Sequence, residues 1–265
     1  MSKQVNATEP LRSPNQYIVD VINSKVSTPI GIRDSRIKPI LDEVKIWSGP
    51  QLADIFVSGS SAKGTALKGS SDLDLFVSLK ANTSETLKIL YSSFHNHLSK
   101  KFTVLKQNVS VRVTYNRLQI DLVPGKKMPN QTHWHYLYTN RRPDQERIQT
   151  NVNHHVSTVV NSGRVNEIIA LKIWRELNRL EFPSMYLEMY VLDALHQKRT
   201  GKIYLADNFE HVLEHIARYF PNKAIYDPAN GSNTISDSLF KHEKTSIQQA
   251  AEKSIQKNYL SQILY

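Results

Sequence analysis

Residues 58–79 read SGSSAKGTALKGSSDLDLFVSL, and this stretch decides the fold. Its last eight residues, from Asp72 to Leu79, alternate in the manner of a β-strand. Successive side chains of a strand point to opposite faces, so Asp72 and Asp74 project together, away from an apolar face. That face consists of Leu73, Leu75, Val77 and Leu79. Folding alone gives no reason for a strand to carry two neighbouring carboxylates.

The paired carboxylates predict a metal site. Two like charges this close repel each other and raise each other's proton affinity unless a cation lies between them. A divalent ion with hard oxygen ligands is such a cation, so Mg²⁺ is expected, and Mn²⁺ would suit the same ligands. Asp121, in RLQIDLVP, likewise points away from apolar neighbours. If its strand lies beside that of Asp72, three carboxylates can hold two ions, the arrangement that nucleotidyl transfer uses.

The loop before the strand supplies groups that bind phosphate. An Asp-x-Asp pair by itself is usually a solvated strand end or part of a turn, so the loop is what favours a site here. It offers backbone N–H groups, hydroxyls and an ammonium, and its glycines allow close approach of the backbone. The residues concerned are Gly59, Ser60, Ser61, Lys63, Gly64 and Thr65. Phosphate donors and metal ligands within residues 59–74 form a specific combination.

The composition narrows the class of protein. The chain has 265 residues, of which 40% are hydrophobic, enough for one large domain or two packed lobes. A formal net charge of +10 favours polyanionic partners such as nucleotides, nucleic acid or an anionic membrane. The absence of cysteine excludes disulfides and thiolate metal sites. No signal core or membrane-spanning run is visible, so a soluble, cytoplasmic protein is expected, with no membrane partner.

The patterns along the chain predict an α+β fold, an α/β lobe followed by a helical lobe. Helices are expected at 33–47 and 83–100, and strands at 52–57, 72–79, 109–115 and 118–123. In the third strand, Ser110, Arg112 and Thr114 share the face opposite the valines. These strands predict a mixed or antiparallel sheet with helices against it. The first dozen residues are expected to be flexible.

The second half is expected to be helical. Residues 124–142 have the composition of a loop, and further helices are expected at 164–180, 184–198, 207–219 and 240–258. We therefore expect a catalytic lobe at residues 1–150 and a helical, substrate-binding lobe at residues 151–265.

The motifs resemble those of a known superfamily. Gly-Ser, then Gly-Thr, then Ser-Asp-x-Asp, with a later Asp on another strand, is similar to the nucleotidyltransferases typified by DNA polymerase beta. The form GSSAKGTALKGSSDLDLFV resembles the branch that contains 2′-5′-oligoadenylate synthetases, cyclic GMP-AMP synthase, the bacterial cGAS/DncV-like enzymes (CD-NTases) of anti-phage defence, and archaeal-type CCA-adding enzymes. The two-lobed nucleotidyltransferase fold is what this resemblance implies.

Downstream segments extend the resemblance over residues 55–255. They are GRVNEIIALKIWRELN, FPSMYLEMYVL and YDPANGSNTISDSL. By this resemblance, Asp72, Asp74 and Asp121 would be the catalytic, metal-binding carboxylates. Gly59 and Ser60 would touch the triphosphate, and the outer phosphates would be held by Lys172 and Ser184.

Two residues of the helical half are unusual: a lysine in an apolar run, and a tyrosine one position later than in the family. Lys172 is the only polar residue in IIALKIW, so it must snorkel, pair with an acidic group, or meet an anionic ligand such as a triphosphate. The family places a tyrosine directly after the serine, where its ring can stack on the base. Here the order is Ser184, Met185, Tyr186. Either Tyr186 stacks with altered geometry, or the stacking comes from another residue.

The motifs predict a Mg²⁺-dependent, template-independent nucleotidyltransferase that binds a nucleoside triphosphate, with Asp121 as the base. The resemblance suggests a cyclic or linear oligonucleotide signal made in antiviral or anti-phage defence, with a nucleic acid as product or activator and a separate effector protein that responds. The alternatives are a CCA-adding tRNA nucleotidyltransferase, an adenylyltransferase for small molecules or proteins, and a nucleic-acid-binding relative without catalysis.

Three further features are weaker indications of a binding or metal site. The stretch from His133 to Tyr138 mixes aromatic side chains with nearby cations, which suits base stacking but is equally compatible with an ordinary loop. His154-His155 lacks partners at metal-ligand spacing. The lysines of residues 241–257 are mixed with glutamates, a pattern that favours a solvated helix face over a nucleic-acid-binding surface.

Overall fold

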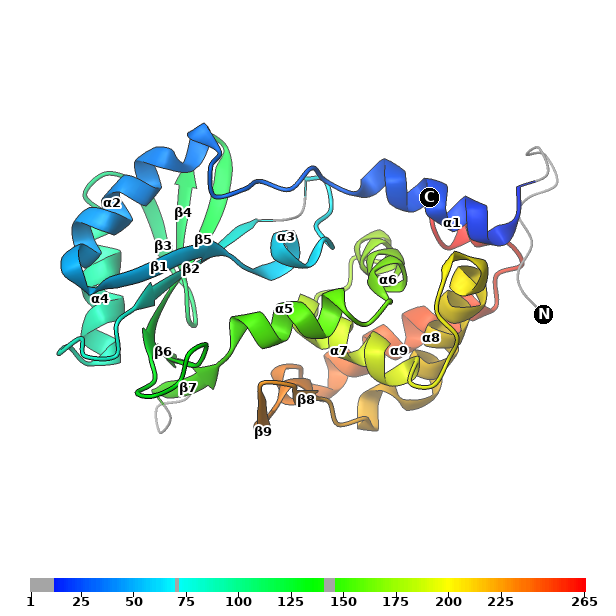
Figure 1. Cartoon of the computed structure of the whole chain (residues 1–265). Coiled ribbons are helices and arrows are strands. Elements are labelled where there is room, and N and C mark those ends of the chain that lie inside the picture. Colours follow the sequence, from blue (N-terminus) through cyan, green and yellow to red (C-terminus); the bar gives the residue numbers. More distant parts are fainter. Residues whose placement is uncertain (1–11, 70–71, 141–145) are drawn as a thin grey trace. The chain divides into compact units, whose positions relative to one another are not determined.

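The computed structural model describes residues 12–69, 72–140 and 146–265 (Figure 1). Within these ranges, the chain forms two compact units. One comprises the described residues of 28–64 and 70–156, which we call the sheet unit. The other comprises those of 1–27, 65–69 and 157–265, which we call the helical unit. The expected single boundary after residue 150 differs from this division, because two earlier segments of the chain pack with the C-terminal helices.

The sheet unit is built on a mixed sheet, as expected. Its strands are β1 (Leu52–Val57), β2 (Leu73–Leu79), β3 (Thr103–Lys106), β4 (Val111–Tyr115), β5 (Leu118–Lys127), β6 (His135–Tyr138) and β7 (Arg147–Thr150). The order is β1-β2-β5-β4-β3, with β6 pairing with β5 and β7 with β6. The pair β2 and β5 is parallel, and the other pairs are antiparallel.

One face of this sheet carries the apolar core. Helices α2 (Lys38–Ser48) and α4 (Leu87–Leu98) pack there (Figure 1). The core side chains alternate along each strand, so the residues between them point to the other face. The strand residues in this core are Leu73, Leu75, Val77 and Leu79 of β2, Val111 and Val113 of β4, and Ile120 and Leu122 of β5. The predicted division of β2 into an apolar face and a carboxylate face is therefore confirmed at its start.

Part of the sheet was wrongly predicted as loop. Residues 124–142 were expected to be irregular, yet β5 continues to Lys127 and β6 follows at His135–Tyr138. The loop-like composition misleads because Gly125 is required inside the strand: a Cβ at this position would lie 2.4 Å from Cζ of Phe76. A glycine in a strand marks such a close approach as often as it marks a turn.

The helical unit contains the later helices that the patterns predict. They are α6 (Val165–Leu177), α7 (Ser184–Ala194), α8 (Leu205–Tyr219) and α9 (Lys241–Ile255), preceded by α5 (Val152–Val160), which leads in from the sheet unit. A hairpin of β8 (Tyr226–Asp227) and β9 (Asn230–Thr234) lies between α8 and α9 in the sequence. Among the described residues, none of the helices is both long and apolar enough to cross a bilayer.

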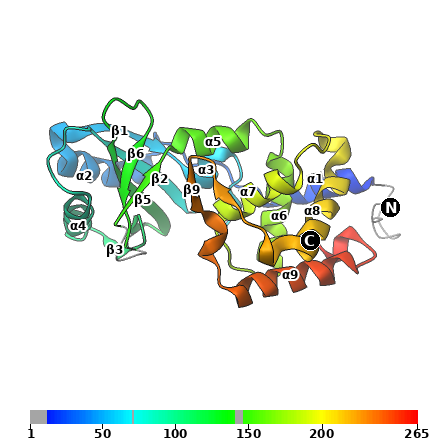
Figure 2. The same ribbon diagram turned by 90° about the horizontal axis from the view of Figure 1, so that it is seen from below.

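Helix α1 (Pro14–Lys25) belongs to this unit, where it contacts α6 and α8 (Figure 2). It was missed because its surroundings are polar and rich in proline. Ser13 caps it, and Pro14 occupies the first turn, where a proline costs little. The side chains of Ile18 and Ile22 are buried, and the Tyr17 hydroxyl donates to the Leu264 carbonyl at 2.7 Å. Helix α1 and the C-terminal residues therefore share one core.

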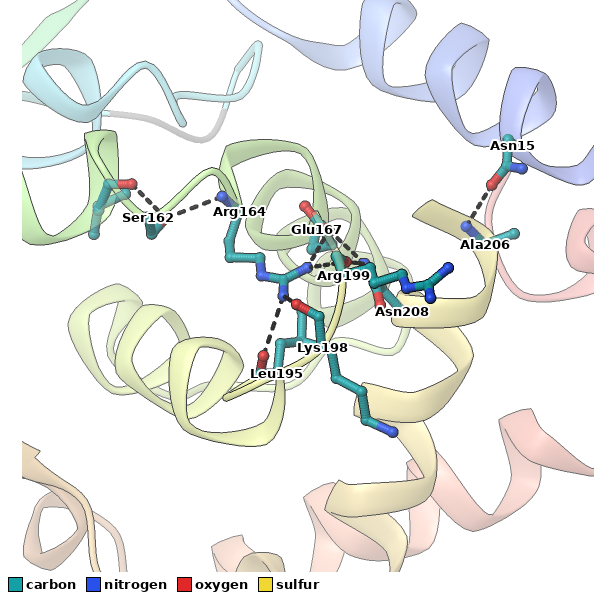
Figure 3. Close-up of polar contacts among 10 residues, drawn as sticks. Asn15, Ser162, Arg164, Glu167, Leu195, Lys198, Arg199, Ala206 and Asn208 are labelled. Atoms are coloured by element: carbon teal, nitrogen blue, oxygen red, sulfur yellow. Dashed lines mark hydrogen bonds and ion pairs between the residues drawn. The ribbon is translucent and has the colours of Figure 1, made fainter. Parts of the chain in front are cut away.

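A buried arginine organises the loop between α7 and α8 (Figure 3). The guanidinium of Arg164 donates to the carbonyls of Leu195, Lys198 and Arg199 and pairs with Glu167 at 3.1 Å. Asn208 donates to the same Glu167 oxygen at 2.9 Å. These contacts give hydrogen-bond donors to carbonyls of the segment that follows α7. The loop is thus fixed by side chains from α6 and α8.

Candidate active site

Three ionisable side chains form a row across adjacent strands of the sheet, on the face opposite α2 and α4. In the parallel pair, Asp74 of β2 lies opposite Asp121 of β5. In the antiparallel pair, Asp121 lies opposite Arg112 of β4. Asp72 directly precedes β2. The strand of Asp121 therefore lies beside that of Asp74, as the three-carboxylate hypothesis required.

Arg112 binds two of the carboxylates. Its Nε donates to Oδ1 of Asp121 at 2.8 Å, and its Nη2 donates to Oδ2 at 2.8 Å, so the contact is a two-pronged fork. Nη2 also donates to Oδ2 of Asp72. The remaining Nη1 donates to the Gln119 side chain at 3.2 Å. Sequence reasoning missed this residue, although the alternation of β4 already put Arg112 on the face opposite the valines.

Asp74 lies in the least favourable surroundings for a charge. Burial, together with the nearby charges of Asp121 and Asp72, raises its pKa to about 6. The ammonium of Lys63 and the backbone N–H of Ser60 act in the opposite direction. Burial also raises the pKa of Asp72, although Arg112 opposes the shift. The site thus concentrates negative charge that its own cations compensate only in part.

Gly59 makes room for Asp74. The short helix α3 (Gly59–Lys63) follows β1, and the backbone N–H of Ser58 donates to the Asp74 carbonyl at 2.8 Å. Gly59 has φ +58, in the left-handed region, and a Cβ there would lie 1.7 Å from Oδ2 of Asp74. Only glycine meets both demands. The predicted close approach of the loop backbone is therefore toward the carboxylate itself.

We expect Gly59→Ala to lower nucleotidyl transfer at least about 100-fold, because a misplacement of about 1 Å in a catalytic group has an effect of that size. Gly69→Ala is the matched control: its φ is +78, yet no atom lies within 4 Å of the added Cβ. This control should cost only about 1 kcal/mol of stability, the backbone strain alone. Turnover and thermal melting of both variants measure the difference, and equal turnover would contradict the proposed role of Gly59.

The chemistry of these carboxylates fits a hard divalent cation. Asp72, Asp74 and Asp121 are the residues that would hold Mg²⁺, because carboxylate oxygens are its usual protein ligands. The crowding of like charge around buried Asp74 is the structural sign of such a site. In the arrangement seen here, no group of three or more acidic, histidine or cysteine side chains among the described residues is positioned to hold a metal ion. The positive charge beside Asp72 and Asp121 is instead that of Arg112.

Lys172 lies in the helical unit and is paired with an acidic group. Its Nζ donates to Oε1 of Glu188 and to Oγ1 of Thr65, both at 2.8 Å. Lys172 is 2% exposed, and Glu188 and Thr65 are fully buried. Of the three options left open by the sequence, the structure favours pairing. The predicted phosphate contacts of Lys172 and Thr65 therefore gain no support from this geometry.

The start of α7 also differs from expectation. Tyr186 is fully buried, with its ring stacked on Phe220 at 5.1 Å between centroids. A ring in this position would have to leave the core to stack on a nucleotide base, so the burial favours the other option, stacking by another residue, and a nucleotide contact of Tyr186 stays a prediction. Ser184 is partly exposed, and its Oγ accepts from Nη1 of Arg175 at 3.3 Å. Its phosphate contact remains a prediction.

The aromatic and basic stretch from His133 to Tyr138 is largely structural. His135 is buried, its Nε2 lies 2.8 Å from Oγ of Ser78, and burial lowers its pKa to about 4. Tyr136 lies under the guanidinium of Arg147. The strand β6 thus uses these side chains for packing within the sheet.

A known protein family matches the part of the chain that carries the three carboxylates. Residues 36–136 match the model of the nucleotidyltransferase domain family. This range includes Gly59, Asp72, Asp74, Arg112 and Asp121. The sequence has no significant match among curated proteins.

Solved structures with the same fold include several bacterial CD-NTases. The chain is similar to CdnG of Bradyrhizobium diazoefficiens in complex with GTP, with a TM-score of 0.73, 11% identity and coverage of 97% of this chain and 94% of that one. It is similar to CdnC of E. coli MS115-1 with ATP, with a TM-score of 0.68, 18% identity and coverage of 91% and 89%. It is also similar to the CdnE cyclic dinucleotide synthase of Elizabethkingia meningoseptica with GTP and Apcpp, with a TM-score of 0.66, 14% identity and coverage of 93% and 100%.

These findings confirm the predicted superfamily, fold class and enzyme class. The chain contains a nucleotidyltransferase domain, and its fold is that of the CD-NTases. Because the identities are low, the structural likeness shows the fold alone. The family match is what indicates transfer of a nucleotidyl group.

Proposed function

We propose that this chain, which contains a nucleotidyltransferase domain, is a Mg²⁺-dependent and template-independent enzyme that joins nucleotides into a cyclic or linear oligonucleotide signal. Its substrate would be a nucleoside triphosphate, and its other product would be pyrophosphate. The observation that carries the proposal is the row of Asp74, Asp121 and Arg112 on three adjacent strands, with Asp72 beside it.

Residues of the sheet unit would have separate roles in nucleotidyl transfer. Asp72, Asp74 and Asp121 would bind Mg²⁺, which supplies positive charge to the acceptor hydroxyl and to the departing pyrophosphate. Asp121 would take the proton of the acceptor hydroxyl at a carboxylate oxygen. The acceptor oxygen would then form a bond to the α-phosphorus, while the bond from that phosphorus to the bridging oxygen breaks and pyrophosphate leaves with that oxygen. Backbone N–H groups of Gly59 and Ser60 would position the triphosphate.

Two findings support a nucleotide signal as the product. The fold matches that of CD-NTases over most of the chain, and one of these proteins, CdnE, is a cyclic dinucleotide synthase. The motifs in residues 58–79 resemble the same branch. We propose that the signal acts in anti-phage or antiviral defence through a separate effector protein. A protein partner is a further option, since CdnC was also solved in complex with HORMA-deltaN.

The experiment is a product assay on the full chain. The protein is incubated with labelled nucleoside or deoxynucleoside triphosphates and Mg²⁺, and the products are resolved by mass spectrometry. We expect release of pyrophosphate together with a cyclic or short linear oligonucleotide. A label transferred to tRNA, to a protein or to a small molecule would instead support one of the alternative transferases.

The double variant Asp72→Ala with Asp74→Ala is the control for the site. It should release no pyrophosphate above background. If the wild-type chain is inactive with every triphosphate and acceptor, or if the double variant retains activity, the proposed function is wrong.

A further inference from the structure

We infer that Arg112 is a charge gate at the proposed metal site: its guanidinium holds Asp72 and Asp121 together and must release Asp72 before a divalent ion can bind all three carboxylates. The inference rests on the proposed function only in taking Asp72, Asp74 and Asp121 as the metal ligands.

The contacts of Arg112 are directed at the ligands themselves. Both oxygens of Asp121 accept from its guanidinium at 2.8 Å, and Oδ2 of Asp72 accepts a third hydrogen bond. The side chain of Arg112 is 26% exposed, and that of Asp121 is 12% exposed. In such partly buried surroundings, charge interactions are stronger than in bulk water. The guanidinium therefore supplies charge that a divalent ion would otherwise supply.

A bound ion and the present position of Arg112 compete for the same oxygens. A divalent ion prefers carboxylate oxygens whose lone pairs are free, and it repels a guanidinium at short range. The side chain cannot escape this repulsion by losing its proton, because arginine stays protonated in proteins. The positive charge has to move when the ion arrives.

Asp72 is the contact that should break. It receives one hydrogen bond from Arg112, whereas Asp121 receives two from the fork. Asp72 is also the more exposed partner, at 31% against 12%, and it precedes β2 rather than lying within it. Arg112 and Asp121 face each other across paired strands, so their contact is fixed by the sheet. The guanidinium can move off Asp72 and stay hydrogen-bonded to Asp121, because each Asp121 oxygen keeps a second lone pair for the ion.

The test measures Mn²⁺ alone, without nucleotide, by the electron paramagnetic resonance signal of the free ion over the metal-free full chain. Arg112→Gln should bind Mn²⁺ at least about fivefold more tightly than the wild type, because the competing charge is gone. Arg112→Lys keeps the charge but loses the fork, so its affinity should lie between those of the wild type and Arg112→Gln. Arg33→Gln, which removes a charge from an exposed arginine of the same unit, is the matched control and should change nothing.

Affinity in Arg112→Gln that is equal to or weaker than in the wild type would overturn the inference. If the variant unfolds in EDTA, Mn²⁺ should restore its far-UV circular dichroism, and failure to do so would count equally against it. The assay contains no triphosphate, so its outcome is separate from that of the product assay. A chain that transfers no nucleotide can still show the gate, and an active chain can lack it.

Discussion

Replacing Asp74 by asparagine should abolish nucleotidyl transfer and at the same time stabilise the protein. The loss of activity is expected to reach about 1,000-fold, because a charge that stabilises the transition state is removed from the centre of the site. The change keeps the shape of the side chain, so the space provided by Gly59 is still filled. Pyrophosphate release under saturating triphosphate and Mg²⁺ measures the effect.

The gain in stability follows from the raised pKa of Asp74. Its folded pKa is about 6 and its ordinary value is 3.8, so the folded state binds the proton more tightly than the unfolded state does. Protonated Asp74 therefore contributes its full stabilisation of the folded state below pH 3.8, and this stabilisation is lost as the pH rises to about 6. At pH 7.5, in the absence of metal, we expect Asp74→Asn to raise the free energy of unfolding by about 1–3 kcal/mol.

Urea unfolding in EDTA at pH 4 and at pH 7.5 checks this prediction. The variant and the wild type should have nearly equal stability at pH 4 and should differ at pH 7.5. Asp54→Asn, on the exposed part of neighbouring β1, is the matched control and should show no such pH-dependent difference. A variant that is less stable than the wild type at pH 7.5 would show that Asp74 is not under electrostatic strain.

Replacing Lys172 by methionine should destabilise the protein by about 3–5 kcal/mol, because it removes the ammonium that pairs with the buried carboxylate of Glu188. The Thr65 hydroxyl would lose the same partner. Thr65 begins the segment from residue 65 to 69 that packs in the helical unit, where the backbone N–H of Ser27 donates to the Ala66 carbonyl at 3.0 Å. Thermal and urea unfolding measure the loss.

The double variant Lys172→Met with Glu188→Leu decides between the two roles of Lys172. Replacing both members of a buried ion pair by apolar residues is often neutral for stability, so most of the loss should be recovered. If Lys172 is structural, the double variant should also keep its KM for the triphosphate within a few-fold of the wild type. A large rise in KM in a stable double variant would instead support the phosphate contact that the sequence motif implies.

Lys253→Met is the control for this experiment. It removes an exposed lysine of α9 in the same unit. Surface substitutions of this kind usually change stability by no more than about 0.5 kcal/mol. An equal loss in both single variants would mean that the buried pair has no special role.

The local elements were predictable wherever a periodic pattern is undisturbed. The strand at 52–57 and the helices around 38–48, 165–177 and 241–255 were found because apolar side chains recur at strand or helix spacing. The pattern failed for α1 and β6. In the first, a segment that follows a polar, proline-containing N-terminal stretch is helical because Ser13 caps it and the core buries Ile18 and Ile22. In the second, residues of loop composition form a strand between β5 and β7.

For the site, the sequence by itself determined which side chains face away from the core. Strand alternation put Asp74, Asp121 and Arg112 opposite their apolar neighbours, and the glycine and serine loop indicated phosphate chemistry. Only the tertiary structure decided that β2 and β5 are parallel neighbours in the register that sets Asp74 opposite Asp121, and that Arg112 lies next in the row. It also paired Lys172 with Glu188 and buried Tyr186. The reason is physical: the face of a side chain follows from bonds to its sequence neighbours, whereas its partners follow from hydrogen bonds and packing between segments far apart in the chain.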